Sequence, residues 1–585
     1  MLPFDFSPPR PDPALTENPS PRLRGLVLVL LALLAMGWML GNQFVQDDAG
    51  VMVDNALLRH WSGVWEAFSA SYWPPRDSHE LYRPLSIAWF TVQWQLGGGA
   101  PLLFRCVSLA LYAGVTLAVW RLLLLVAPPG AAWLGAALFA VHPVHTEALA
   151  IAVNQSELIV ALCVAMALHL RITADRDPTR TRRHGALIWL LFLVAVFTKE
   201  HALVLIPLLW VADLALDPAA WRTRVRQWGL HTLVLILTAA AFWAIRTRIL
   251  GGGTGTQIAE ALEGSTMLGR AYTMVGVPAE WLRLLVWPAH LQSDWNLLEW
   301  VPTAGWSLRE TAGAATLVAW VAGVAAAWRR RPVAAFGLLW IGAALAPVTN
   351  ILIPSGILLA ERTLFLPSIG FVIVLADLAG WFETRPAALD RRERAGAALI
   401  VGCLIAAGAA RSATRMGDWT NRPIFLAVQS VDAPLSWRVH LSLGFLYVDL
   451  GRNDQARLEF RRALRLRADT PLALKSVADR MRRDKGDCAG PVILYDELLT
   501  VLPGRSDIRG SQVACLLYMA RYTEARAEAE RGVALGLDAD YFRYVAGVAD
   551  SAVAAGAPAR SVRLRPVGHG ATDVDTRRLS NGAAQ

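Results

Sequence analysis

Long apolar segments alternate with short polar connections along most of the chain, from about residue 25 to residue 411. A helix needs about 20 apolar residues to cross the hydrocarbon core of a bilayer. Eleven segments have this length or come close to it, at about 25–42, 101–126, 131–146, 154–172, 185–199, 201–216, 229–250, 309–328, 333–350, 361–381 and 396–411. The pattern therefore predicts an all-α fold, a polytopic membrane helix bundle.

A twelfth apolar segment, at about 267–287, carries Arg270, Glu280 and Arg283, and each of these charges is costly at the bilayer centre. The arginines further along the chain also argue against a crossing here. With the N-terminus inside, a crossing would place the arginine clusters of 328–332 and 385–394 outside, against the positive-inside rule. We therefore expect an interfacial or re-entrant helix on the outer side.

The same rule orients the rest of the chain. Residues 1–24 are expected to form a cytoplasmic tail before an uncleaved anchor, because no small-x-small cleavage site precedes Asn42. Eleven crossings within a transmembrane domain at 25–411 place its first long loop, 43–100, and the residues after about 412 outside. Only three of the 56 basic residues are lysines, and this bias indicates a GC-rich bacterial coding sequence. The expected location is a bacterial inner membrane, with the outer face in the periplasm.

Composition narrows the class of protein further. The chain is 55% hydrophobic and only 18% charged, which excludes an ordinary soluble enzyme. Its net charge of +9 would suggest nucleic acid in a soluble protein, but the arginines cluster in short loops between apolar segments, where membrane topology explains them. We expect no nucleic-acid partner. The five cysteines show no CxxC motif and no spacing typical of a zinc site.

From Trp437 onward the sequence becomes charged and follows a helical period. Its first helix pair matches the tetratricopeptide pattern at Gly444, Tyr447, Ala456, Phe460 and Ala463. A second copy fits 34 residues later, and a third slips by one residue. We predict a periplasmic tetratricopeptide α-solenoid at 412–555, either a binding platform for a protein or a spacer, and a disordered tail at 556–585.

Two cysteines fall in this predicted domain. Cys488 would begin the second helix of the second repeat, and Cys515 would lie late in the first helix of the third. Those helix faces adjoin in a tetratricopeptide stack. The pattern therefore predicts a disulfide in an oxidising compartment.

The first outer loop begins with a pair of carboxylates, Asp47 and Asp48, directly after the first span, and carries Arg83 further along. Such a pair can be solvated loop charge, a general base or a pair of metal ligands. The residues alone leave these alternatives open. An aromatic stretch, "RHWSGVWEAFSASYW", lies between the two carboxylates and Arg83, and its composition is typical of a membrane interface.

The second outer corner contains His142, His145 and Glu147. Two histidines three residues apart can bind a metal, but the sequence offers no convincing third ligand. Hydrogen-bonded ends of a helix hairpin explain them equally well.

Charged residues also occur at the ends of later spans. Lys199 lies between two apolar segments with almost no loop, so it must pair with Glu200 or with a ligand anion. Glu361 and Arg362 begin another span, where they form either an interfacial ion pair or part of a phosphate clamp. Carboxylates and cations thus gather at one membrane surface, as an enzyme that takes a sugar from a lipid phosphate requires.

An ordered set of motifs resembles a known family, the transmembrane and tetratricopeptide repeat-containing protein O-mannosyltransferases, of the C-fold class of glycosyltransferases. The matching stretches are "FVQDDAGVMVDN", "YRPLSIAWF", "AVHPVHTEALA", "TKEHALVLIPLLW", "WLRLLVWPAHLQSDW", "LAERTLFLPSIGF" and "HLSLGFLYVDLGR". They occur in the family's order from about residue 40 to 470. The resemblance implies a membrane enzyme with its active site and its repeats on the same outer face.

The resemblance also implies roles for single residues. By this resemblance Asp47 would be the catalytic base, with Asp48 beside it to position the acceptor. Lys199 and Arg362 would contact the donor phosphate, assisted by Arg83. The second-loop contribution would come from His142, His145 and Glu147. The implied donor is a polyprenyl-phosphate mannose, the reaction inverts the anomeric centre, and no metal or other cofactor is expected.

One departure affects the expected substrate. After the histidine motif the family usually continues with a Gly-Arg-acidic stretch, whereas this chain has "AVNQSEL" with Gln155 and Ser156. The sugar therefore need not be mannose. The expected acceptor is a periplasmic protein or glycan, and a protein partner on the repeats is a further expectation. The alternatives are a transferase that modifies envelope lipid or polysaccharide, and a non-catalytic scaffold that presents the repeats.

Overall fold

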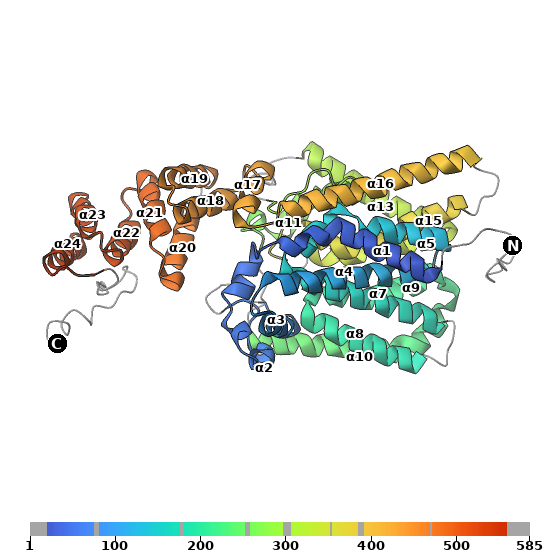
Figure 1. Ribbon diagram of the computed structural model, residues 1–585. Helices are drawn as coiled ribbons and strands as arrows, with labels where there is room; N and C mark the ends of the chain where they lie inside the picture. The colour runs from blue at the N-terminus through green and yellow to red at the C-terminus, as the bar shows by residue number, and fades with distance from the viewer. Residues whose placement is uncertain are drawn as a thin grey trace.

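The computed structural model describes residues 20–74, 81–175, 181–251, 258–295, 306–351, 354–383, 391–468 and 471–558. Throughout these ranges the chain forms helices joined by turns and contains no β-strand, which confirms the all-α prediction. Figure 1 shows a bundle of long, roughly parallel helices and a smaller arm of short helices beside one end of it. Most of the predicted N-terminal tail and of the predicted disordered tail lies outside the described residues.

Eight helices in the described part of the chain are long and apolar enough to cross a membrane. They are Pro21–Gly41, Pro101–Leu123, Ala152–Ala174, Thr181–Thr198, Pro218–Ile249, Leu308–Arg330, Glu361–Glu383 and Ala395–Gly417. Each coincides with one of the eleven predicted segments. Each of these spans contains all or most of one helix labelled in Figure 1. In chain order the helices are α1 (Pro21–Met36), α4 (Pro101–Leu123), α7 (Gln155–Asp175), α8 (Thr181–Thr198), α10 (Trp221–Ile249), α13 (Leu308–Arg330), α15 (Phe365–Glu383) and α16 (Arg391–Gly417).

The other three predicted segments form helices that are too short to be counted as spans by length alone. They are α5 (Pro129–Ala140), α9 (Leu205–Leu216) and α14 (Pro332–Leu345). Proline explains two of the early ends, because Pro143 and Pro347 cannot continue the helices that precede them. The apolar pattern thus located all eleven helices and overestimated the length of three.

The segment at 267–287 forms two short helices, α11 (Met267–Val275) and α12 (Val277–Val286). Nine and ten residues reach only about 15 Å each, half the thickness of a hydrocarbon core. Glu280 and Arg283 pair with each other on α12, which reduces the cost of both charges. As expected from the arginine distribution, this segment is not a single crossing helix.

Small residues allow close packing within the bundle. Gly337 of α14 and Gly370 of α15 face each other so closely that a Cβ on either would lie 2.6 Å from the other's carbonyl oxygen. Helices in lipid associate through such close contacts, because lipid tails are as apolar as the side chains and no hydrophobic free energy is gained when two helices pack together. The contact fixes α15, whose preceding turn carries Arg362.

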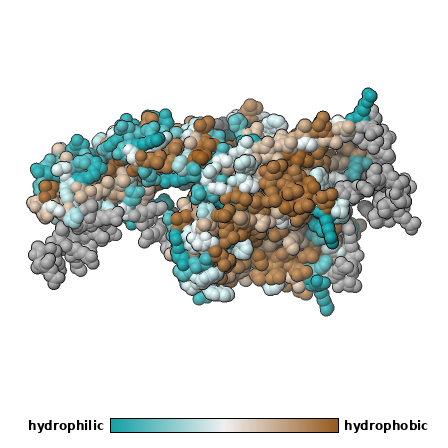
Figure 2. Space-filling model, viewed as in Figure 1, coloured by the Kyte–Doolittle hydropathy of each residue, from teal (hydrophilic) through white to brown (hydrophobic). Residues whose placement is uncertain are grey.

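Figure 2 shows a broad hydrophobic surface on the visible face of the bundle and a more hydrophilic surface on that of the arm. The first-loop helices α2 (Gly63–Glu66) and α3 (Pro84–Gly97) lie at the end of the bundle that adjoins the arm (Figure 1). The start of α1 lies towards the opposite end of the bundle. The first-loop helices and the arm thus lie at the same end of the bundle, whereas the side of the membrane on which they lie stays a prediction.

The arm contains eight helices in its described residues: α17 (Arg422–Asp432), α18 (Trp437–Asp449), α19 (Asn453–Leu466), α20 (Leu472–Arg480), α21 (Ala489–Val501), α22 (Ser506–Tyr518), α23 (Tyr522–Ala534) and α24 (Ala539–Ala554). Gly444 of α18 lies directly under the ring of Phe460 of α19, where a Cβ would come within 2.3 Å of the ring. Ala456 and Ala463 are fully buried in the same pair. These are the contacts expected of the first repeat, whereas the repeat assignment as a whole stays a prediction.

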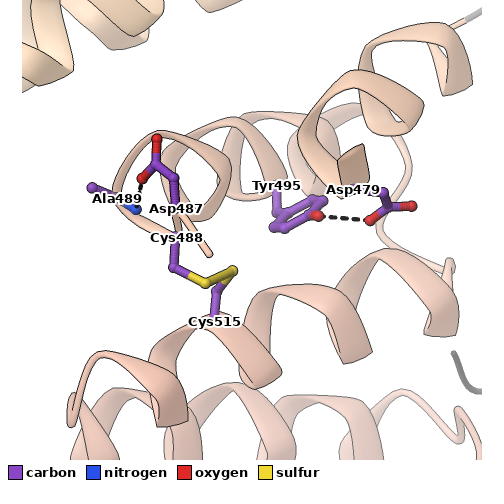
Figure 3. The surroundings of a disulfide bond; sticks show 6 residues. All are labelled: Asp479, Asp487, Cys488, Ala489, Tyr495 and Cys515. Carbon is purple, nitrogen blue, oxygen red and sulfur yellow. Dashed lines mark hydrogen bonds between the residues drawn. A yellow bond between two sulfur atoms is a disulfide. The ribbon is translucent and has the colours of Figure 1, made fainter. Parts of the chain in front are cut away.

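Cys488, directly before α21, forms a disulfide with Cys515 of α22, and their Cα atoms lie 5.2 Å apart (Figure 3). The predicted pairing is therefore present. Beside it, the Tyr495 hydroxyl donates a hydrogen bond of 2.6 Å to Asp479, which ties α21 to α20. The two links hold three consecutive helices of the arm together.

We expect the Cys488→Ser, Cys515→Ser double variant to lose about 3.5 kcal/mol of stability in the arm, because the disulfide closes a loop of 27 residues. Thermal unfolding of the purified full chain, followed by limited proteolysis of the arm, would measure the loss. Cys403→Ser, at an exposed free cysteine, serves as the control. The prediction would be wrong if both Cys488 and Cys515 reacted with an alkylating reagent in protein that had not been reduced.

Candidate active site

The two carboxylates of the first loop have different surroundings. Asp48 is fully buried, and its two oxygens accept hydrogen bonds from the backbone N–H groups of Ala152 (3.1 Å) and Val153 (3.0 Å). A third bond, of 3.2 Å, comes from the Arg105 guanidinium. Burial raises the pKa of Asp48 to about 6, against the lowering effect of these donors. Asp48 therefore holds the loop against the turn that precedes α7.

Arg105 lies one turn into the membrane helix α4 and is completely buried. Besides Asp48 it binds three backbone carbonyls, those of Ala150 (2.6 Å), Gln43 (2.6 Å) and Asn42 (3.3 Å). One guanidinium thus joins the exit of the first span, the first loop and the second outer corner. Arg105 is not among the site residues predicted from the sequence, although an arginine inside an apolar span is itself a signal of a functional or organising role.

Asp47 points elsewhere. It is half-buried and lines a cavity of about 200 Å³, whose other charged lining residues are Glu260, Asp294, Arg362 and Arg438. The residue before it, Gln46, has a φ of +53°, in the left-handed region that side chains with a Cβ rarely adopt. Such strain persists only where the surroundings enforce it and is concentrated at functional sites. Adjacent residues in the sequence thus place one carboxylate in the protein core and the other in a cavity.

The three predicted cations each pair with a carboxylate from another segment. Arg83 donates from Nε (3.0 Å) and Nη2 (2.6 Å) to Glu200 in a two-pronged ion pair. Lys199 pairs with Glu157, and Arg362 pairs with Glu147 through both its backbone N–H and its guanidinium. The partners differ from the predicted neighbours, because Lys199 does not bind Glu200 and Arg362 does not bind Glu361. Extended backbone at Lys199 and the turn at Glu361 direct adjacent side chains apart.

These pairs form one electrostatic cluster with Asp47. The charge of Asp47 acts on Arg362, with which it shares the cavity. Burial is the largest single effect and raises the pKa of Glu200, but the charge and hydrogen bonds of Arg83, together with the charge of Lys199, lower that pKa to about 2. The Arg83 guanidinium also lies 5.1 Å from the ring centre of Tyr72, a cation–π contact that the sequence did not indicate. The predicted basic residues are therefore brought together and oriented by carboxylates that are buried or partly buried.

The two histidines of the second outer corner have hydrogen-bond partners within the protein. The Nε2 of His142 donates to the carbonyl of Leu285 at 2.9 Å. His145 is buried between the Tyr112 hydroxyl and the Ser368 hydroxyl, each at 2.9 Å. Across the described residues no group of three His, Cys, Asp or Glu side chains is placed to hold a metal ion. The third predicted residue of this corner, Glu147, reaches the site through its pair with Arg362.

A matched pair of variants should separate the two carboxylates. We expect Asp48→Asn to destabilise the protein by about 3 kcal/mol, because it leaves Arg105 buried without a countercharge. Asp47→Asn should change stability by less than about 0.5 kcal/mol, as for a half-exposed side chain. Thermal unfolding in detergent measures both. Equal melting temperatures for the two variants would refute the structural role of Asp48.

Comparison with known proteins gives the site its context. No family model matches the chain, and no solved structure matches it. The chain is similar to human protein O-mannosyl-transferase TMTC4, with 26% identity over 499 residues, covering 74% of this chain and 64% of the human protein. It is also similar to protein O-mannosyl-transferase F38B6.6 of Caenorhabditis elegans, with 25% identity over 457 residues, covering 75% of this chain and 62% of that protein.

Human protein O-mannosyl-transferase TMTC1 is a further relative, with 25% identity over 508 residues, covering 74% of this chain and 54% of the human protein. The chain thus spans less than two thirds of the length of these relatives. The similarity extends over about three quarters of the chain and confirms the resemblance carried by its motifs. The chain is thus similar over most of its length to protein O-mannosyl-transferases, TMTC4 and TMTC1 among them.

Proposed function

We propose that the protein is a membrane glycosyltransferase that moves a sugar, mannose or a similar hexose, from a polyprenyl phosphate to a hydroxyl group of a protein. The observation that carries this proposal is the shared cavity of Asp47 and Arg362, which brings a base and a cation to one cavity. A lipid-phosphate donor needs a cation at its leaving group, and a hydroxyl acceptor needs a base on the opposite side.

In the proposed reaction Asp47 takes the proton of the acceptor hydroxyl. The acceptor oxygen then forms a bond to the anomeric carbon while the bond from that carbon to the phosphate oxygen breaks. The polyprenyl phosphate leaves with the electron pair, and attack from the opposite side inverts the anomeric centre. Asp48 acts indirectly, because its hydrogen bonds hold the strained turn that presents Asp47.

The donor phosphate would be held by Arg362, with Lys199 and Arg83 behind it. The pair of Arg362 with Glu147 engages the backbone N–H and Nη1. A guanidinium has five N–H donors, so further donors remain for a phosphate oxygen. Glu147, Glu157 and Glu200 would fix the directions of the three cations and keep them stable while the site holds no donor.

Two further points favour protein O-glycosylation in a cell envelope. The relatives are named protein O-mannosyl-transferases. The arm of short helices lies at the bundle end that carries the site, where a protein acceptor would arrive from water (Figure 1). We place the bundle in a bacterial inner membrane with the site and the arm in the periplasm, following the distribution of arginines in the sequence.

Asp47→Asn tests the base. We expect sugar transfer to fall about a thousandfold, because the amide cannot accept the acceptor's proton. Mass spectrometry of glycoproteins from a deletion strain carrying each variant would measure the effect, with Asp54→Asn, an exposed carboxylate of the same loop, as the control. Wild-type glycosylation in cells that carry Asp47→Asn would rule out this assignment.

Arg362→Lys tests the phosphate contact. Lysine keeps the charge but loses the planar fork, so we expect the KM for the lipid-phosphate sugar to rise about tenfold. The matched control is Arg422→Lys, at an exposed ion pair with Asp449 on the arm. An unchanged donor KM, measured in purified protein by release of polyprenyl phosphate, would argue against phosphate binding by Arg362.

A further inference from the structure

A second, larger cavity adjoins the cavity of Asp47. It has a volume of about 810 Å³ and lies between membrane-domain loops and the first helices of the arm. Its walls include Ile258, Glu260 and Gly356 from the loops, and Arg438, Leu472 and Ser476 from the arm. We call it the arm cavity. Three residues, Glu260, Gly356 and Arg438, line both cavities, so the two spaces are direct neighbours.

We propose that the arm cavity binds an extended segment of the acceptor polypeptide, so that one Ser or Thr side chain reaches Asp47 from it. This inference rests on the proposed function and names the class of acceptor. A volume of this size is too small for a folded domain and within the range of sites that enclose a ligand of several residues. The hydroxyl side chain would enter the smaller cavity while the backbone on either side stays in the arm cavity.

The lining suits a polypeptide better than a sugar chain or a lipid. Glycine and small side chains, Gly356, Ala473 and Ser476, allow a backbone to approach closely, and apolar Ile258 and Leu472 are exposed beside them. A glycan would need an open aromatic face. The Trp437 ring is almost fully buried, with the guanidinium of Arg438 at 5.1 Å and that of Arg467 at 5.9 Å from its centre.

The two walls of the arm cavity are joined at one carboxylate. Glu260, on the loop after α10, accepts hydrogen bonds from the Trp437 indole and ion pairs with Arg438 (2.5 Å) and Arg467 (2.7 Å). A second tie joins Ser436 to Asp294. The arm is therefore held against the loops at a fixed distance from Asp47, as a binding site that positions one residue for reaction requires.

The experiment fills the arm cavity without touching Asp47 or the cations. Ser476→Trp and Ala473→Trp place a large ring on its α20 wall, and Ala527→Trp places the same ring on an exposed face of α23. The acceptor is the protein found glycosylated in wild-type cells. We expect both cavity variants to raise the KM for this acceptor at least about tenfold, with kcat and donor hydrolysis changed less than about twofold.

Wild-type acceptor KM in the Ser476→Trp protein would overturn the inference, since this exposed position disturbs no packing. A second readout separates the inference from the proposed function. A photo-crosslinking phenylalanine derivative at position 476 of the full chain is irradiated with a short synthetic peptide that contains Ser and Thr. Crosslinking that excess unlabelled peptide competes away supports the inference, and its absence overturns it. Specific crosslinking by a protein without transferase activity would reject the proposed function alone.

Discussion

The buried contact between Arg105 and Asp48 organises the end of the bundle that carries the first loop. An arginine within an apolar helix is tolerated only with a countercharge and filled hydrogen-bonding capacity. Arg105 obtains both from segments far apart in the sequence, the loop at 42–48 and the corner at Ala150. The cost of burying this charge thus fixes the first loop relative to α7, and the strained turn at Gln46 can then present Asp47 to the cavity.

The row of buried ion pairs beside this contact follows the same physical rule. Arg83, Lys199 and Arg362 each lie where an unpaired charge would be costly, and each is matched by a glutamate. Pairing keeps the three cations in place without a ligand. It also reduces the net positive charge, so the phosphate of the proposed donor would bind through the N–H donors that remain. Such a site favours ligands that fit its geometry over anions in general.

The sequence revealed the helices and the polar corners but not the pairing between corners. The apolar segments located all the long helices, because the thickness of the bilayer sets the length of an apolar segment that must cross it. The apolar pattern does not predict that Lys199 pairs with Glu157 and not with Glu200, because this choice of partner depends on the backbone direction at a single residue. The histidines show the same limit, because a motif typical of metal sites here bonds to Leu285, Tyr112 and Ser368.

The loop that carries Asp47 is also tied to the end of the last span. Asn42 donates to the carbonyl of Met416 at 3.0 Å, and the backbone N–H of Gln43 donates to the carbonyl of Thr420 at 2.8 Å. From Thr420 the chain runs directly into α17, where Asp432 binds the buried Arg415 of α16 at 2.8 Å. The proposed base and the arm are thus anchored on the same helix end. A hydroxyl held by the arm would therefore meet Asp47 in a geometry set by these few hydrogen bonds, because neither partner can move without breaking them.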